Sequence, residues 1–312
     1  MSVRSKFKTL VILDLETTGF IQDEPKITEL AMIAVNIEAL ERTKPEDELP
    51  RVMNKFVKCF DPVKLISSEV AQITGLTNLM LMEYAPFNRE TVIALEAFLS
   101  DFQQPICLVA HNGDHYDFPI LFHEIQNAMT NSGHSIDTHT QLNYQSMNMQ
   151  TNEHDDNALT TNNISVQTIS SKEDHDQISF LSISCGDSFT FFRYMRDILT
   201  NGDQNDKSIH SNNMILSSEK NTSYVPTPDP TRSKQSLKLS KIYQREIPQG
   251  ALHLKCHQAE HDCLMLLALL KRYLPKWLDW LEVNHHPLSY FSSSSLSITI
   301  ETSSPNMNVN VK

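Results

Sequence analysis

Hydrophobic positions recur along the chain with two different spacings, which predict strands and helices. Short runs rich in apolar and β-branched residues predict strands at 9–15, 27–37, 51–62, 105–113 and 178–188. Apolar residues at helical spacing predict helices at 67–77, 88–102, 117–130 and 259–274, with Pro275 ending the last one. The links between the first strands are too short to hold helices, so the pattern predicts an antiparallel meander at the start.

Two internal stretches and the C-terminal end lack this periodicity. Residues 137–176 are rich in Asn, Ser and Thr and hold seven acidic residues against one lysine, and residues 201–235 are similarly polar. Neither stretch can bury enough apolar surface to offset the entropy lost on ordering, so both are predicted to be flexible insertions. We therefore expect one folded domain over residues 1–283 and a flexible tail over 284–312.

The charge balance narrows the ways in which this chain could act on nucleic acid. Its 312 residues carry a formal charge of −12, whereas a sequence-independent DNA binder is typically basic. An acidic chain must therefore hold nucleic acid locally, through metal ions, backbone amides and a few bases. The odd count of 5 cysteines, without a CxxC pair, argues against a disulfide framework or a zinc site.

The apolar segments bear on cellular location. No apolar run reaches the roughly 18 residues that a transmembrane helix needs. Five apolar or small residues separate Lys8 from Asp14, which is too short for the core of a signal peptide. We therefore expect an intracellular protein of the cytoplasm or nucleus, neither secreted nor membrane-spanning.

Candidate chemistry begins where the first apolar run ends, in "TLVILDLETTGF" at residues 9–20. Asp14 and Glu16 stand two positions apart, so on a strand their carboxylates point to the same side. Two like charges directed at one spot repel each other unless a cation lies between them. The pair is a poor structural choice without a ligand, and it indicates a metal site.

Three further segments place acids and histidines where strands end or helices begin. They are "LVAHNGDHYDFPIL" at 108–121, "SCGDSF" at 184–189 and "HQAEHDCLMLLALL" at 257–270. Each has an ordinary structural explanation when taken alone. Asp187 is expected to be a solvated turn residue, "HNGD" is a common turn composition, and the acids of "HQAEHD" suit a helix N-terminus.

Taken together, "DLETTG", "HNGDHYDFPIL" and "HQAEHD" resemble the three motifs of the DEDDh 3′→5′ exonucleases, and in particular the three-prime repair exonuclease family. The similarity continues in "ITGLT", "LPRVMNKFVKC" and "KLSKIYQREI", and it covers residues 8–136, 178–198 and 236–274. The resemblance implies an α/β, ribonuclease H-like exonuclease fold, with a mixed central sheet flanked by helices and two long insertions. It makes residues 1–283 a DEDDh exonuclease domain.

The same resemblance implies a two-metal site for Mg²⁺, with Mn²⁺ as a substitute. The carboxylates that match the family's ligands are Asp14, Glu16, Asp117 and Asp262. Hard divalent cations prefer oxygen ligands, and a pair of them can serve both the attacking and the leaving oxygen of a phosphodiester. The family motif places a ligand just before "FP", which selects Asp117 and leaves Asp114 as a turn or N-cap acid.

His257 is the implied general base, because an imidazole can take a proton from water near neutral pH. It precedes Asp262 by five positions, a rotation of roughly 500° on an ideal helix, so the two side chains would diverge if both were helical. We therefore expect His257 in a mobile loop before the helix. His261 is expected to be a surface residue of the helix, and Glu260 an acid that favours its N-terminus.

Substrate contacts are also carried over from the family. Those with the terminal nucleotide are Glu16, Thr17, Phe20 and Ile73, and Tyr116 would lie beside the scissile phosphate. Phe20 is suited to stacking on a base. The alternative for Phe20 and Ile73 is simple packing in the core.

The resemblance implies a metal-dependent 3′→5′ DNA exonuclease of DNA degradation or repair, which releases nucleoside 5′-monophosphates from single-stranded or frayed 3′ ends. It also implies a homodimer through an edge strand at 53–60. Two alternatives stay open: an exoribonuclease, which would have to accommodate the 2′-hydroxyl, and an inactive exonuclease fold that binds nucleic acid. The presence of all the carboxylates and of His257 argues against the inactive fold.

Overall fold

A mixed sheet with the strand order β3-β2-β1-β4-β5-β6 runs through the part of the chain that the computed structural model describes. That part comprises residues 5–44, 46–130, 180–201, 235–248 and 253–292. The strands are β1 (Thr9–Thr17), β2 (Ile27–Asn36), β3 (Asn54–Cys59), β4 (Ile106–Ala110), β5 (Ser184–Asp187) and β6 (His286–Pro287). β1, β4 and β5 are parallel, and the remaining pairs are antiparallel, so the predicted meander and the mixed sheet are confirmed. The expectation that the first links are too short for helices is wrong, because the link between β2 and β3 begins with the short helix α1 (Ile37–Glu41).

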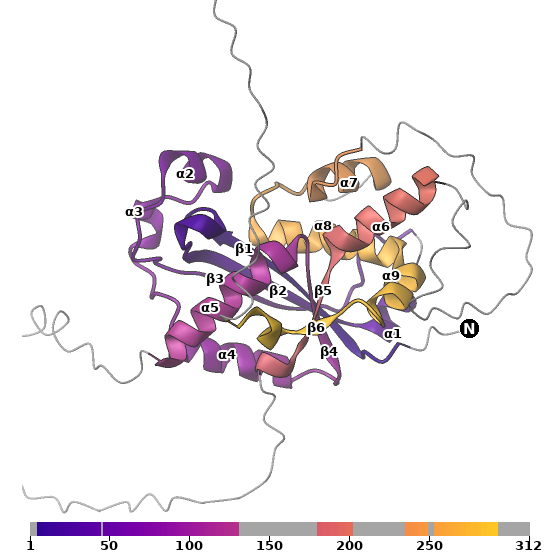
Figure 1. Cartoon of the computed structure of the whole chain (residues 1–312), viewed down its shortest axis with the longest axis horizontal. Coiled ribbons are helices and arrows are strands. Elements are labelled where there is room, and N and C mark those ends of the chain that lie inside the picture. The colour runs from indigo at the N-terminus through magenta and orange to yellow at the C-terminus, as the bar shows by residue number, and fades with distance from the viewer. Residues whose placement is uncertain (1–4, 45, 131–179, 202–234, 249–252, 293–312) are drawn as a thin grey trace, which may run out of the picture.

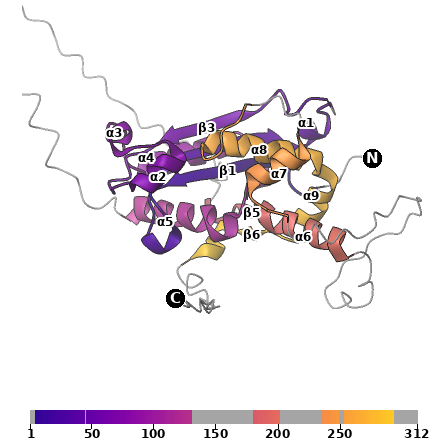
Figure 2. The ribbon, with the colours of Figure 1, turned by 90° about the horizontal axis from the view of Figure 1, so that it is seen from above.

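Helices cover both faces of this sheet (Figures 1 and 2). One face packs against α1 (Ile37–Glu41), α6 (Ser188–Asn201), α7 (Leu239–Glu246), α8 (Ala259–Arg272) and α9 (Leu274–Leu281). The other face packs against α4 (Arg89–Ser100), α5 (Asp117–Thr130) and the 3₁₀ helix η6 (Leu288–Phe291). The short helices α2 (Ser68–Thr74) and α3 (Asn78–Leu81) lie at one end of the molecule, at the upper left of Figure 1. Within the described ranges, no helix has the length and apolar character needed to span a bilayer.

β1 is buried on both faces, which explains its continuous apolar run. Leu10 and Ile12 belong to the core beneath α8 and α9, whereas Val11 and Leu13 belong to the core beneath α4 and α5. Because side chains alternate along a strand, the even-numbered positions face α8. Asp14 and Glu16 continue this even series, so the pattern directs both carboxylates toward the α8 side of the sheet.

Helix α2 begins and ends at residues that favour these positions. The Ser67 hydroxyl accepts a hydrogen bond from the Val70 N–H at 3.2 Å, which satisfies one of the free donors of the first turn. Gly75 ends α2 with a φ of 77°, a left-handed conformation that glycine adopts without strain. The helix predicted at 67–77 is thus present as α2, between the cap at Ser67 and Gly75.

Pro275 does not close the helical region, so that prediction is wrong. α8 ends at Arg272, and Pro275 lies in the first turn of α9. Proline is well tolerated there because the first N–H groups of a helix lack partners within the helix. α9 then buries Trp277 and Leu281 completely against the core, which a closing proline would not have predicted.

The folded part extends past the predicted boundary at residue 283. β6 pairs with β5, and Leu288 and Phe291 are buried in the core on the α5 side. Residues 286–291 therefore belong to the folded domain, with β6 in the sheet and η6 on one of its faces. Residues 137–176 and 202–234 lie outside the described residues, as does the tail from 293 onward, so the flexibility predicted for them stays a prediction.

Candidate active site

A cleft of about 660 Å³ gathers every candidate site residue of the sequence. Strand β1, the helix α2, the turn before α5, the loop before α8 and the start of α7 supply its walls. The candidate residues among its lining are Asp14, Glu16, Thr17, Phe20, Ile73, Tyr116, Asp117, His257 and Asp262. Segments far apart in sequence are thus brought to one place.

The acids converge because three elements end or begin at the same point. Asp14 and Glu16 come from β1, Asp117 is the first residue of α5, and Asp262 lies in the first turn of α8. The Leu15 N–H donates a hydrogen bond to Asp117 Oδ1 at 3.1 Å, which ties α5 to the strand between the two β1 acids. The carboxylates therefore surround one volume at the end of β1.

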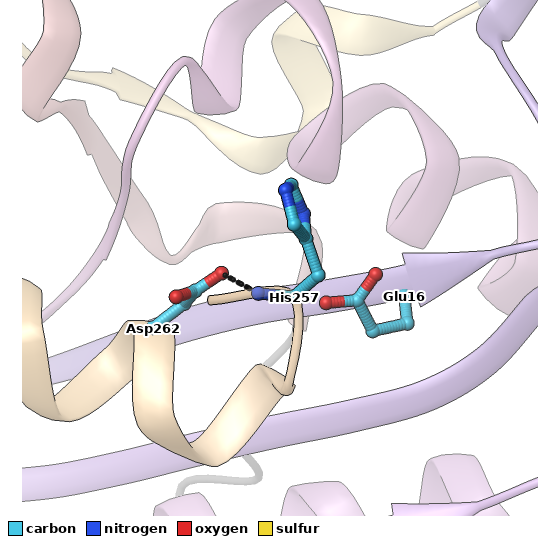
Figure 3. A group of neighbouring side chains, drawn as sticks. All are labelled: Glu16, His257 and Asp262. Carbon is cyan, nitrogen blue, oxygen red and sulfur yellow. Dashed lines mark hydrogen bonds between the residues drawn. The ribbon is translucent and has the colours of Figure 1, made fainter. Parts of the chain in front are cut away.

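Glu16, Asp262 and His257 form the tightest group. One ligand atom from each of them lies within 4.8 Å of the others, and Figure 3 shows His257 between the two acids. The His257 N–H donates to Asp262 Oδ2 at 3.0 Å. Carboxylate oxygens that converge in this way suit a hard divalent cation such as Mg²⁺.

The acids are electrostatically unfavourable as they stand. Burial is the largest cause that raises the pKa of Glu16 to about 8, and repulsion from Asp262 and Glu29 adds to it. Burial also raises the pKa of Asp117 to about 8, although the Leu15 N–H lowers it, and that of Asp262 to about 6. The pKa of Asp14 is raised well above its usual value by burial and by Asp117. A bound cation would reverse these shifts because it favours the ionised carboxylates.

Glu29 is a fifth acid at this site, and sequence reasoning missed it. It lies opposite Glu16 in the antiparallel β1–β2 pair, and its Oε2 accepts a hydrogen bond from the Ala259 N–H at 3.0 Å. Ala259 is the first residue of α8, so Glu29 caps the helix that carries Asp262. Glu29 can be recognised only from the pairing of β1 with β2, which places it opposite Glu16.

His257 lies outside α8, as the sequence predicts. It precedes the helix by two positions, its side chain is exposed, and its φ of 62° is unusual for a residue other than glycine. This left-handed turn directs the His257 N–H to Asp262 and leaves the imidazole at the cleft. A non-helical position therefore resolves the angular mismatch between the two residues.

His261 and Glu260, which the sequence predicts to lie outside the site, do not line the cleft. His261 Nδ1 accepts a hydrogen bond from the Lys255 N–H at 3.1 Å, which folds the preceding loop onto the helix. Glu260 pairs with Lys55 of β3 at 2.7 Å. Both residues support the start of α8 without joining the group of acids.

Phe20 and Ile73 are exposed, so the alternative that they pack in the core is wrong. Their side chains are 64% and 54% accessible, and both line the cleft. Tyr116 lines the same cleft, and its hydroxyl bonds to Thr17 Oγ1 and donates to the Gly19 carbonyl at 3.0 Å. Burial raises the pKa of Tyr116 to about 12, so its hydroxyl keeps the proton at neutral pH.

Asp187 is not a solvated turn residue, which corrects the sequence-based expectation. It is 2% exposed and accepts hydrogen bonds from the Asn112 N–H at 2.8 Å and from the Phe189 N–H at 2.9 Å. Thr190 Oγ1 donates a third at 3.2 Å. Asp187 thus caps α6 and fixes the turn after β4, and burial raises its pKa.

His111 forms a wall of the cleft without titrating near neutral pH. Its two ring nitrogens lie 2.9 Å from Ser188 Oγ and 2.8 Å from the Leu237 carbonyl. Burial lowers the pKa of His111 to about 4, so the ring is neutral and bridges α6 to the segment before α7. This segment adds Leu237 and Lys238 to the cleft, and the start of α7 adds Leu239 and Ser240.

This sheet order, with helices on both faces, is that of the ribonuclease H-like exonuclease fold predicted from the sequence, and the acids converge at the end of its strand β1. The sequence profile of the RNase_T exonuclease family matches residues 11–176, more than half of the chain. The protein belongs to this exonuclease family, and the family predicted from the three motifs is confirmed.

Curated relatives match a smaller part. Three prime repair exonuclease 2 of Mus musculus is 42% identical over 132 residues, which are 40% of this chain and 56% of that protein. Three-prime repair exonuclease 1 of Bos taurus is 42% identical over 127 residues, or 38% and 40% of the two chains. The chain thus spans about half the length of the curated relatives it matches.

Two solved structures share a distant likeness. Cell-death related nuclease 4 (CRN-4) has a TM-score of 0.46 at 13% identity, covering 87% of this chain and 65% of that one. An E. coli ExoI–ssDNA complex has a TM-score of 0.46 at 14% identity, covering 88% and 42%.

The raised pKa values set the sign of a pH effect on stability. A carboxyl whose pKa is raised by folding costs stability as pH rises between its unfolded and folded pKa values. With a chelator present, we expect a lower melting temperature at about pH 8 than at about pH 5, because Glu16 and Asp117 must then ionise while buried. Thermal unfolding followed by circular dichroism measures this difference.

A matched variant and added Mg²⁺ show whether the pH effect comes from these acids. Glu16→Gln has one buried acid fewer, so its melting temperature should fall less between the two pH values. Mg²⁺ should raise the melting temperature more at the higher pH, because it binds ionised carboxylates. An equal pH response in the variant, or a response to Mg²⁺ that does not grow with pH, would contradict the assigned cluster.

Proposed function

We propose that this protein is a metal-dependent 3′→5′ exonuclease that removes nucleoside 5′-monophosphates from single-stranded or frayed DNA 3′ ends. The observation that carries the proposal is the convergence of Asp14, Glu16, Asp117 and Asp262 in one cleft with His257 at its edge. Membership of the exonuclease family supports the reaction class. The similarity to three-prime repair exonucleases supports DNA ends as the substrate.

The acids fit Mg²⁺ as the resident metal. Their donor set consists of carboxylate oxygens, and no cysteine sulfur is needed to complete it. When bound, two such ions would activate the attacking water and stabilise the charge on the leaving 3′-oxygen. The hydrogen bond from the Leu15 N–H to Asp117 and the cap from Glu29 to α8 hold the ligand side chains in place.

In this proposal, His257 accepts the proton of the attacking water. Its exposed imidazole lies beside Glu16 and Asp262, and its main chain is anchored by the hydrogen bond to Asp262. Histidine is the side chain most often used to accept a proton from water near neutral pH.

The opposite wall of the cleft is suited to a nucleoside. Phe20 and Ile73 present exposed apolar surface, on which a base can stack or pack. The neutral Tyr116 hydroxyl, which the Gly19 carbonyl fixes, would contact the scissile phosphate, and Thr17 and Glu16 would hold the terminal nucleotide. This arrangement favours the recognition of a chain end over an internal segment.

The variants that test the chemistry should separate metal binding from proton transfer. Asp14→Asn and Asp262→Asn should abolish Mg²⁺-dependent release of nucleotides from a labelled single-stranded DNA. His257→Ala should lower kcat by about 10²–10⁴-fold, the usual contribution of a general base, and should keep the rise in melting temperature that Mg²⁺ causes. Glu260→Gln, at the same helix end but outside the cleft, is the control and should keep its activity. Full activity in Asp14→Asn would refute the site.

The substrate class is tested with matched oligonucleotides. DNA and RNA of the same sequence, labelled at the 5′ end, are digested side by side with Mg²⁺. We expect DNA to be shortened from its 3′ end at least about tenfold faster, a difference of roughly 1.4 kcal/mol between the two transition states. Equal or faster digestion of RNA would favour the exoribonuclease alternative.

The proposal includes a homodimer that pairs along residues 53–60. β3 is an edge strand whose one described partner is β2, and Val57 is 42% exposed on it. Sedimentation should give about twice the chain mass of 35.6 kDa. Val57→Lys should shift the protein toward the monomer, because charge on an edge strand opposes pairing. Val63→Lys, at a position that is 77% exposed and lies outside the strand, should not, and a monomeric wild type would disprove the dimer.

A further inference from the structure

The turn that presents Tyr116 and Asp117 to the cleft is held from its far side. This turn is the 3₁₀ helix η2 (Gly113–His115), which directly precedes the two residues. Asp114 does not line the cleft, and its Oδ1 lies 2.8 Å from His286 Nε2. The two partners are 172 positions apart in sequence, so β6 holds the turn through a long-range ion pair.

The position of His286 is fixed by its surroundings. Its main chain pairs with Cys185 of β5, and the ring centroids of Tyr290 and Phe291 lie 4.8 and 5.0 Å from its own. Phe118, the residue after Asp117, packs edge-on against it at 6.4 Å. The imidazole thus touches the turn through Asp114 and the start of α5 through Phe118.

A second tether leaves the turn little freedom. Asn112 has a left-handed φ of 66°, and its N–H donates to the buried Asp187 at 2.8 Å. Gly113 has no room for a side chain, since a Cβ there would lie 2.6 Å from the Phe118 ring. With Asp187 at one end and His286 at the other, small shifts of the turn would be passed on to Tyr116 and Asp117.

The charges around His286 favour its protonated form. Burial lowers its pKa, but the hydrogen bond and charge of Asp114, together with Asp187, raise it above the ordinary value overall. His285 is the neighbouring base and Tyr290 the neighbouring hydroxyl. Because folding raises this pKa, the ion pair contributes fully at low pH and weakens as pH rises through the pKa of the folded protein.

We propose that His286 is a positioning residue of the active site, whose imidazolium pairs with Asp114 and so fixes the turn that presents Tyr116 and Asp117. The effect on turnover rests on the proposed function, whereas the effect on the turn does not. Among the described residues, the hydrogen bonds and the ion pair of His286 involve Asp114 and Pro287 and none of the proposed metal ligands. It acts through the main chain of the turn.

Hydrogen exchange tests the turn without any substrate. In His286→Gln, the amides of residues 112–117 should exchange roughly fivefold faster than in the wild type at the same pH, as expected for the loss of a charge-assisted bond. His286→Arg keeps the cation and should restore protection.

His285→Gln, the same change one residue away, is the control. Asp114→Asn removes the partner and should give the same result if His286→Gln does not fold. Unchanged exchange in the folded variants would overturn the proposal.

Kinetics on the full-length protein test the consequence for catalysis. His286→Gln should lower kcat roughly fivefold with little change in KM, and adding Asp114→Asn should lower it no further, because the two act as one pair. The ratio of kcat for His286→Arg to wild type should rise with pH, since only arginine stays charged. A ratio independent of pH would overturn the positioning role. A wild type that degrades no nucleic acid but shows the expected exchange would refute the proposed function alone.

Discussion

Repulsion among the carboxylates buried at the end of β1 is the constraint around which the site is organised. Two cores clamp β1 on both faces, so Asp14 and Glu16 cannot turn away from each other. The Leu15 N–H fixes Asp117 between them, and Glu29 holds α8 so that Asp262 completes the group. The fold thus stabilises an arrangement that is unfavourable without a cation, which is the usual property of a preorganised metal site.

The sequence predicts the acids that line the cleft better than the residues that hold those acids in place. Asp14 and Glu16 could be found because strand parity and motif order are local properties. Glu29 could not, since its role depends on the register between β1 and β2. The burial of Asp187 could not be predicted from its neighbours in sequence either, because a turn composition does not show which distant residues pack over it. The Asp114–His286 pair joins residues that only the finished sheet brings together.

The negative charge of the chain is consistent with a cleft that would bind nucleic acid through metal ions and apolar contacts. A formal charge of −12 opposes long contacts with a phosphate backbone. The cleft instead offers apolar walls from Phe20 and Ile73, the side chain of Lys238, and a cluster of acids suited to cations. Under the proposed function, affinity would come from the metal ions and from one or two nucleosides at the end of the strand.

The two edge strands of the sheet differ in length, and this difference bears on how copies of the chain could pair. At one edge, β6 is a two-residue strand that ends at Pro287, a residue with no N–H to donate to a further strand. At the other edge, β3 runs for six residues. Of the edges that the structure describes, β3 alone is long enough for strand addition. In the proposed dimer, antiparallel pairing of β3 with the β3 of a second copy would be self-complementary, so association would stop at a closed two-fold unit.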